Sequence, residues 1–173
     1  MAKAPPKRRK IAPPEEGPPG PKLDAIDRRI LHELQNDGRL TNLQLAERIG
    51  LSPSPCLRRM KRLEEDGVLS RYVALVDPAL VGLEVTVFTR VSLSSQGDAQ
   101  LTRFEKAAAS WPEVMECYLM SGDADYQLRV VVPSLAAYEI FLRQRLTPVP
   151  GIAKIQSSFA FRPVIYRTEL PIP

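Results

Sequence analysis

Residues 51–67, LSPSPCLRRMKRLEEDG, hold two prolines, then four cations in the five positions from Arg58 to Arg62, then three consecutive acids. At 100° per residue, the apolar side chains of this stretch share one face of a helix, and Arg58, Arg59 and Arg62 fall together on the opposite face. The acids lie at the end of the helix where its dipole disfavours them. This pattern favours a basic stripe that contacts a polyanion, although an inert basic surface helix has the same layout.

Two further helices precede this stretch. Apolar residues between positions 23 and 34 recur at helical spacing, with Asp24 as a cap and Gly38 just past the end. The sequence TNLQ, residues 41–44, is a capping box that opens a short helix closed by Gly50. The third helix starts at Ser52 or Ser54, has a proline in its first turn and runs to Gly67.

Three helices with a tight turn after Gly50 predict a helix-turn-helix, in which the last helix enters the major groove of DNA by its N-terminal end. Guanidinium groups pair bidentately with guanine edges or phosphates, and a serine hydroxyl reaches either. We therefore predict contacts to double-stranded DNA from Ser52, Ser54, Pro55, Arg58, Arg59 and Arg62.

After Gly67 the apolar period changes to two, and residues 69–76 predict a linker strand before a connection around Asp77-Pro78 and Gly82. The second half of the chain predicts a βαββαβ order, which is the ferredoxin-like plan of an α+β protein. The expected elements are strand 84–94, helix 98–110, strand 113–121, strand 125–132, helix 134–146 and strand 152–162.

Alternation along these strands assigns two faces to the sheet. We expect the helices to cover Val85, Val87, Val91, Met115, Cys117, Leu119, Leu128, Val130, Val132, Ile155, Phe159 and Phe161. The other face mixes apolar and charged residues: Phe88, Arg90, Glu116, Tyr118, Met120, Arg129, Val131, Lys154 and Gln156. Such a face is expected to pack against the same sheet of a second copy, or else to remain partly wet.

Charge is distributed unevenly along the 173 residues. The net charge of +4 comes from residues 1–22, and the remaining chain is neutral, so any DNA contact depends on local clusters of cations. Residues 1–22 also contain seven prolines and few large apolar residues, which predicts a disordered arm. Its KRRK cluster, residues 7–10, either adds phosphate contacts or is simply a solvated tail.

Several function classes are disfavoured by composition. The two cysteines form no metal or disulfide pattern, and the apolar runs are too short to span a membrane, so we expect a cytoplasmic protein without membrane contact. The single histidine, His32, lies in the first predicted helix, and no nucleophile–base pair or metal-ligand spacing accompanies it. We therefore predict no enzymatic activity and no cofactor.

Two motifs in order, LSPSPCLRRMKRLEEDGVLSRYVALVDPALVGL (51–83) and ECYLMSGDADYQLRVVVP (116–133), carry a resemblance. From about Leu23 to Val164 the chain resembles the leucine-responsive regulatory protein/AsnC (Lrp/AsnC) family of transcription regulators. The resemblance implies a winged-helix-like DNA-binding domain and a ferredoxin-like domain of the RAM type that binds a small effector, usually an amino acid. It also implies a nucleoid-associated protein that forms dimers, which assemble into tetramers or octamers.

On matching positions, the resemblance assigns effector binding, at a subunit interface, to the hairpin residues Met120, Ser121, Gly122, Asp123, Asp125 and Tyr126. A glycine turn with two carboxylates offers acceptors for an ammonium group and backbone N–H donors for a carboxylate. The same residues are also ordinary turn chemistry between two strands.

The predicted organisation is an arm (1–22), a helix-turn-helix domain (23–67), a linker strand and connection (68–83), an effector-binding and oligomerisation domain (84–164) and a tail (165–173). The expected function is regulation of transcription in response to an amino acid. The alternative is a DNA-architectural protein that bends or wraps DNA without a ligand.

Overall fold

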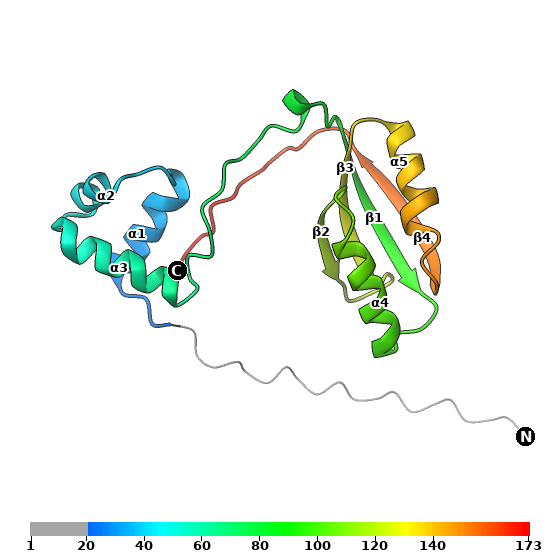
Figure 1. Ribbon diagram of the computed structural model, residues 1–173, viewed down its shortest axis with the longest axis horizontal. Coiled ribbons are helices and arrows are strands. Elements are labelled where there is room, and N and C mark those ends of the chain that lie inside the picture. Colours follow the sequence, from blue (N-terminus) through cyan, green and yellow to red (C-terminus); the bar gives the residue numbers. More distant parts are fainter. Residues whose placement is uncertain (1–20) are drawn as a thin grey trace, which may run out of the picture. The chain divides into compact units, whose positions relative to one another are not determined.

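The computed structural model describes residues 21–173, so the predicted arm lies almost wholly outside the described residues (Figure 1). The chain divides into two compact units. The first unit extends to Val73 and also includes Arg167–Pro173, and the second is Ala74–Tyr166. Among the helices of residues 21–173, none has the length and apolar character that crossing a membrane requires.

The first unit consists of three helices: α1 (Ala25–Asn36), α2 (Asn42–Ile49) and α3 (Pro53–Glu65). Asp24 caps α1 and Thr41 caps α2, each in a capping box, which confirms both predicted helix starts. The helices enclose a core of eight buried residues: Ile30, Leu31, Leu34, Leu45, Ala46, Ile49, Cys56 and Leu63.

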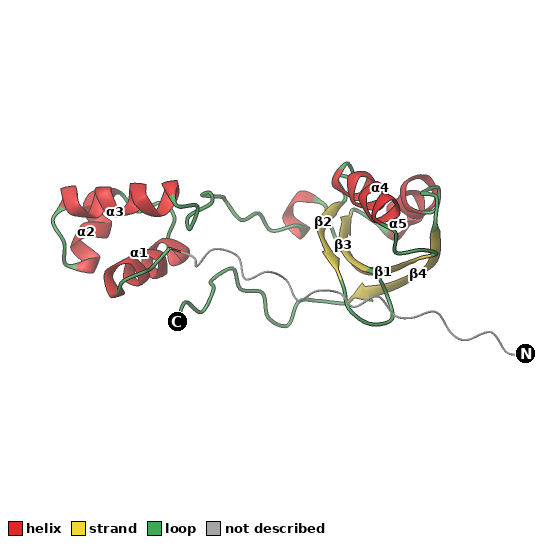
Figure 2. Ribbon diagram, turned by 90° about the horizontal axis from the view of Figure 1, so that it is seen from below, coloured by secondary structure: helices red, strands yellow, loops and turns green. Residues whose placement is uncertain are grey.

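The second unit is a four-stranded antiparallel sheet with two helices on one face (Figure 2). Along the chain its elements are β1 (Val85–Leu93), α4 (Asp98–Ala109), β2 (Val114–Leu119), β3 (Tyr126–Val132), α5 (Leu135–Phe141) and β4 (Ile152–Ala160). The strand order is β2-β3-β1-β4, so the predicted α+β class and βαββαβ order are confirmed. A π-helical segment, Leu142–Leu146, extends α5 toward β4.

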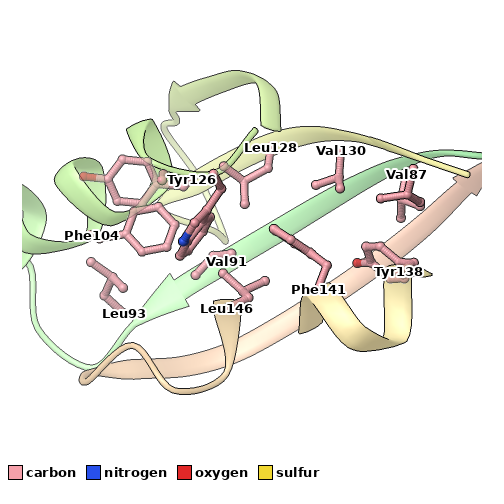
Figure 3. Close-up of a cluster of buried hydrophobic side chains, with 13 residues drawn as sticks. Val87, Val91, Leu93, Phe104, Tyr126, Leu128, Val130, Tyr138, Phe141 and Leu146 are labelled. Carbon is pink, nitrogen blue, oxygen red and sulfur yellow. The ribbon is translucent and has the colours of Figure 1, made fainter. Parts of the chain in front are cut away.

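Aromatic residues fill the space between the sheet and the helices (Figure 3). The ring of Phe104 lies against Tyr126 with centroids 4.5 Å apart, and Trp111 meets Phe141 edge-on at 5.5 Å. Such pairs contribute packing energy beyond the apolar area that they bury. Val87, Val91, Leu128, Val130 and Val132 complete the sheet side of this core, as the alternation predicted.

Hydrogen bonds of Tyr138 and Gln100 connect the helices to β1, to β4 and to the residue that precedes β4. The Tyr138 hydroxyl of α5 lies 2.7 Å from the Thr89 hydroxyl and 2.6 Å from that of Ser157, so all three hydroxyls are paired. Gln100 of α4 donates its Nε2 to the Gly151 carbonyl at 2.8 Å. Gly151 has φ of 88°, and a Cβ there would lie 1.5 Å from Gln100 Nε2, so a larger residue would be strained and would displace the Gln100 side chain.

The predicted sheet faces need correction at two edge strands. The pairing of β2 with β3 shifts between Val114 and Glu116, which places Val114 opposite Val130 on the covered face instead of Met115. Because this bulge adds one residue, alternation alone assigned Met115 to the wrong position. Phe159 is 47% exposed although its ring meets Tyr138, and Phe161 lies beyond the end of β4 and is fully exposed.

The predicted linker strand is wrong for this chain on its own. Residues 68–76 form neither helix nor strand, because no segment of residues 21–173 pairs with them. Their alternating apolar side chains stay largely open to solvent, with Val73 62% and Leu75 63% exposed. Val68 and Leu69 pack against the core of the three-helix unit. The Tyr72 hydroxyl donates to Glu64 at 3.1 Å, and burial, followed by this bond, raises the pKa of Tyr72 to about 12.

Candidate nucleic-acid interface and ligand site

The N-terminal end of α3 is exposed and carries small polar side chains. Ser52 is the N-cap residue, but its hydroxyl makes no capping bond, and Pro53 occupies the first turn. Ser52 and Ser54 are exposed, and Pro55 is half-buried. Pro53 and Pro55 have no backbone N–H, and the Cys56 N–H donates to the Ser52 carbonyl at 3.3 Å. The groups that this end of α3 offers to an anion such as phosphate are therefore chiefly the two serine hydroxyls, at the positive end of the helix dipole.

The three predicted arginines of α3 differ in their surroundings. Arg58 is exposed and has no ion-pair partner within residues 21–173. Arg59 and Arg62 instead converge on the carboxylate of Asp27 in α1, which is 1% exposed. Arg59 Nη1 lies 2.9 Å from Asp27 Oδ1 and 2.6 Å from Asp24 Oδ2, and Arg62 Nη2 bonds to Asp27 Oδ2.

The pKa values at this contact follow from its hydrogen bonds. The pKa of Asp24 is lowered to about 2, first by the backbone N–H of Asp27 and then by Arg59. The bond to Asp24, followed by that to Asp27, raises the pKa of Arg59. Both partners are thus fixed in their charged forms, and α3 is held against the first turn of α1.

Sequence reasoning missed two residues that position α3. Asp27 is one; its signal was an acid placed between the apolar positions 26 and 30 of α1. The other is Asn42, at the start of α2, whose Nδ2 donates to the Pro53 carbonyl at 2.9 Å. Its Oδ1 is buried with no hydrogen-bond partner in the described part of the chain.

The predicted effector hairpin joins β2 to β3, and the structure divides its six residues into two sets. Met120, Ser121, Gly122 and Asp123 are exposed, and Asp125 and Tyr126 are buried. Gly122 has φ of 112°, a backbone conformation that favours glycine.

The buried pair is engaged within the domain. Asp125 accepts hydrogen bonds from the backbone N–H of Leu93 and from Gln96 Nε2, both at 2.6 Å. The Tyr126 hydroxyl donates to Glu105 at 2.9 Å. Burial, followed by this bond, raises the pKa of Tyr126, so the phenol stays protonated. Asp125 and Tyr126 therefore shape the hairpin, and Asp123 is its exposed carboxylate.

A cavity of about 350 Å³ lies beside this hairpin, between α4 and β2. Leu119 and Tyr126, at the two bases of the hairpin, both line it. Its other lining residues are Glu105, Ala108, Ala109, Val114, Met115, Glu116 and Cys117. Cys117 is exposed, and desolvation by the cavity walls, followed by the charge of Glu105, raises the pKa of its thiol. Residues 21–173 bring together no three His, Cys, Asp or Glu side chains that could hold a metal ion.

On the uncovered face of the sheet, two charged side chains form an ion pair with each other. Arg129 and Glu116 lie opposite each other on β3 and β2, with Nη2 and Oε1 2.7 Å apart. Arg90 donates to Gln156 at 2.8 Å. Two large side chains on this face remain in contact with solvent: Phe88 is 37% exposed and Tyr118 is 55% exposed.

Two domain families match the chain. Residues 23–70 match a winged helix-turn-helix DNA-binding domain, and residues 86–170 match the Lrp/AsnC ligand binding domain. The Bkd operon transcriptional regulator of Pseudomonas aeruginosa is 47% identical over 150 residues, covering 87% of this chain and 98% of that protein. The leucine-responsive regulatory protein of Rhizobium meliloti is 43% identical over 142 residues, covering 82% and 91%.

The fold is also similar to solved structures of transcriptional regulators. A transcriptional regulator of Neisseria meningitidis in complex with L-Met superposes with a TM-score of 0.83 at 39% identity, over 87% of this chain and 97% of the other. An AsnC family transcriptional regulator from Agrobacterium tumefaciens gives a TM-score of 0.82 at 46% identity, over 86% and 97%. These similar proteins are transcriptional regulators, not enzymes.

Proposed function

This chain belongs to the Lrp/AsnC family of DNA-binding transcriptional regulators with a ligand-binding domain, and on that premise we propose that it regulates transcription in response to an amino acid. In this proposal, residues 23–67 bind DNA, and residues 84–164 bind the effector and mediate self-association. Because the proposed binding partner is DNA, we also propose that the protein is located at the nucleoid, in the cytoplasm.

The proposed DNA interface consists of the N-cap residue Ser52 and, on α3, of Ser54, Pro55, Arg58, Arg59 and Arg62, the last of which lies in the final turn of the helix. The observation that carries it is the contrast between Arg58, which is exposed and unpaired within residues 21–173, and Arg59 and Arg62, which are fixed by Asp27. A free guanidinium can read a guanine edge bidentately. Arg59 and Arg62 keep N–H groups beyond those bound to Asp27, and these suit phosphate.

Replacement of Arg58 by alanine tests this interface. We expect a loss of about 1–3 kcal/mol for the preferred sequence if Arg58 reads a base, and an equal loss on every sequence if it holds a phosphate. Fluorescence anisotropy on DNA from upstream of the protein's own gene, compared with random DNA, separates the two. The control is Arg103→Ala on α4, which removes the same charge from the other unit. Unchanged affinity for all DNA refutes the interface.

An amino acid is the effector that the hairpin chemistry supports best. The Asp123 carboxylate is exposed and makes no side-chain hydrogen bond within residues 21–173, so it is free to accept an ammonium group. Backbone N–H groups of the glycine turn suit the carboxylate. The neighbouring cavity has mostly apolar walls, which suit an apolar side chain. The solved N. meningitidis relative was crystallised with L-Met.

The effector proposal is tested by titrating each common amino acid into the protein–DNA complex. We expect one or a few apolar amino acids to shift the DNA affinity, and Asp123→Asn to abolish that shift while leaving the DNA affinity without ligand intact. Asp98→Asn, an exposed acid at the start of α4, is the control. A full response in Asp123→Asn moves the site elsewhere. No response to any amino acid supports the architectural alternative, which the match to a ligand-binding domain disfavours.

Self-association is proposed through the uncovered face of the sheet, as a dimer that assembles further into tetramers or octamers. Phe88 and Tyr118 supply apolar surface there, and the pairing of Arg129 with Glu116 lowers the cost of burying charge. Sedimentation velocity across a range of concentrations tests this. Phe88→Asp is expected to dissociate the dimer, and a monomer at micromolar protein before any substitution refutes it.

A further inference from the structure

The segment Arg167–Pro173, here called the tail segment, groups with the three-helix unit although it follows the ligand-binding sheet in sequence. The side-chain amide of Gln35, on α1, bonds twice to Leu170. Its Oε1 accepts the Leu170 backbone N–H at 2.7 Å, and its Nε2 donates to the Leu170 carbonyl at 3.3 Å. Arg28, two turns earlier on α1, donates its Nε to the Pro173 carbonyl. Figure 2 shows this end of the chain beside α1.

The spacing of these contacts matches an extended peptide. Gln35 and Arg28 are seven residues apart on α1, which corresponds to about 10.5 Å along the helix axis. Leu170 and Pro173 are three residues apart, and an extended chain covers about 10 Å over that length. The tail segment thus runs antiparallel to α1, with both anchors in register.

The tail segment also suits docking by its composition. Pro171 and Pro173 restrict Leu170 and Ile172 to extended conformations, so less entropy is lost when the segment is ordered. Pro171 and Pro173 have no backbone N–H to donate, and Gln35 instead accepts the N–H of Leu170, which precedes them. Between the prolines, Ile172 packs against the core of the three-helix unit and is partly buried. Two polar anchors and one apolar anchor therefore hold four residues.

From these contacts we propose that this side of α1 is a peptide-docking surface, whose occupant is the tail segment of the same chain. The helix-turn-helix unit then has two covalent connections to the ligand-binding sheet: the linker before β1, and the chain that follows β4 and returns to α1. The docking contact itself requires neither DNA nor ligand.

Hydrogen exchange in the full chain, without DNA or ligand, tests the docking. The Leu170 amide is expected to exchange more slowly than in an unstructured peptide, and Gln35→Ala to speed it about fivefold. Ile172→Asn is expected to speed it as well, from the other side of the contact. The matched control is Asn36→Ala, because the Asn36 amide bonds to His32 within α1 and not to the tail segment. Unprotected Leu170 in the unaltered protein, or no effect of Gln35→Ala, overturns the proposal.

A mixing experiment tests whether the occupant comes from the same chain. Full-length Gln35→Ala chains are unfolded and refolded together with chains that end at Tyr166, which keep Gln35 but have no tail segment. Docking within one chain leaves Leu170 of the Gln35→Ala chains in fast exchange. A return to slow exchange means that the segment docks on a second copy, which overturns the assignment to the same chain.

Discussion

Replacing Asp27 by asparagine is expected to destabilise the three-helix unit more than any exposed charge change in it. The Asp27 carboxylate is 1% exposed and accepts bonds from Arg59, Arg62 and the Asp24 backbone N–H. Breaking a fully buried ion pair costs about 3–5 kcal/mol. The side chains of Arg59 and Arg62 are 25% and 46% exposed, so water rehydrates them in part, and we expect a loss of about 2 kcal/mol.

The loss is measured by thermal unfolding of the full chain, followed by the helical circular dichroism signal. For a unit of this size, about 2 kcal/mol lowers the transition by roughly 10 °C. Asp66→Asn, an exposed acid at the end of α3, is the control and is expected to change stability by less than about 0.5 kcal/mol. If Asp27→Asn unfolds at the same temperature as Asp66→Asn, the contact between α1 and α3 contributes no stability, and the reasoning from burial fails.

Three further outcomes follow from individual contacts. The pKa of Asp24 is lowered in the folded state to about 2, from an ordinary value of 3.8. The ionised carboxylate therefore stabilises the fold above about pH 4, and this contribution is lost as the pH falls toward 2. Asp24→Asn is expected to weaken that pH dependence in denaturation curves. Gly151→Ala is expected to cost about 1–2 kcal/mol, because alanine is strained at this positive φ and the Gln100 side chain must move away from its bond to the residue-151 carbonyl; an unchanged urea midpoint contradicts this. Tyr138→Phe leaves the buried Thr89 hydroxyl without this partner and is expected to cost about 1–2 kcal/mol by the same assay, whereas a neutral effect means that water replaces the phenol.

Local signals made the helix starts and the order of the elements predictable. Asp24 and Thr41 act on backbone groups within three residues, so both caps, and the capping box at Thr41, could be identified from neighbouring letters; the Asp27 half of the α1 capping box was missed. The alternation of β1 and β3 was reliable because both strands are central in the sheet and one of their faces is buried. Edge strands are less constrained, and the bulge at Met115 went undetected because an inserted residue leaves no mark in composition.

The candidate sites were less predictable, because their contacts join distant parts of the chain. A helical projection treats α3 alone, so it grouped Arg58 with Arg59 and Arg62; the acid that separates them lies 32 and 35 positions earlier, in α1. Asp125 looked like a ligand for an ammonium group, but it binds Leu93 and Gln96 of its own domain. At residues 69–76, the alternation of apolar side chains predicted a strand. Alternation indicates an extended chain, but it does not identify the strand with which that chain would form hydrogen bonds.

The contact between Leu170 and Gln35 also bears on the order in which the protein is made. Synthesis proceeds from the N-terminus, so α1, α2 and α3 leave the ribosome about a hundred residues before the tail segment, or roughly 5 to 20 s earlier at ordinary translation rates. During that interval the three-helix unit lacks the packing of Ile172 and the backbone partner of Gln35. A chain whose translation stops before residue 167 keeps all three helices but never completes the surface of α1.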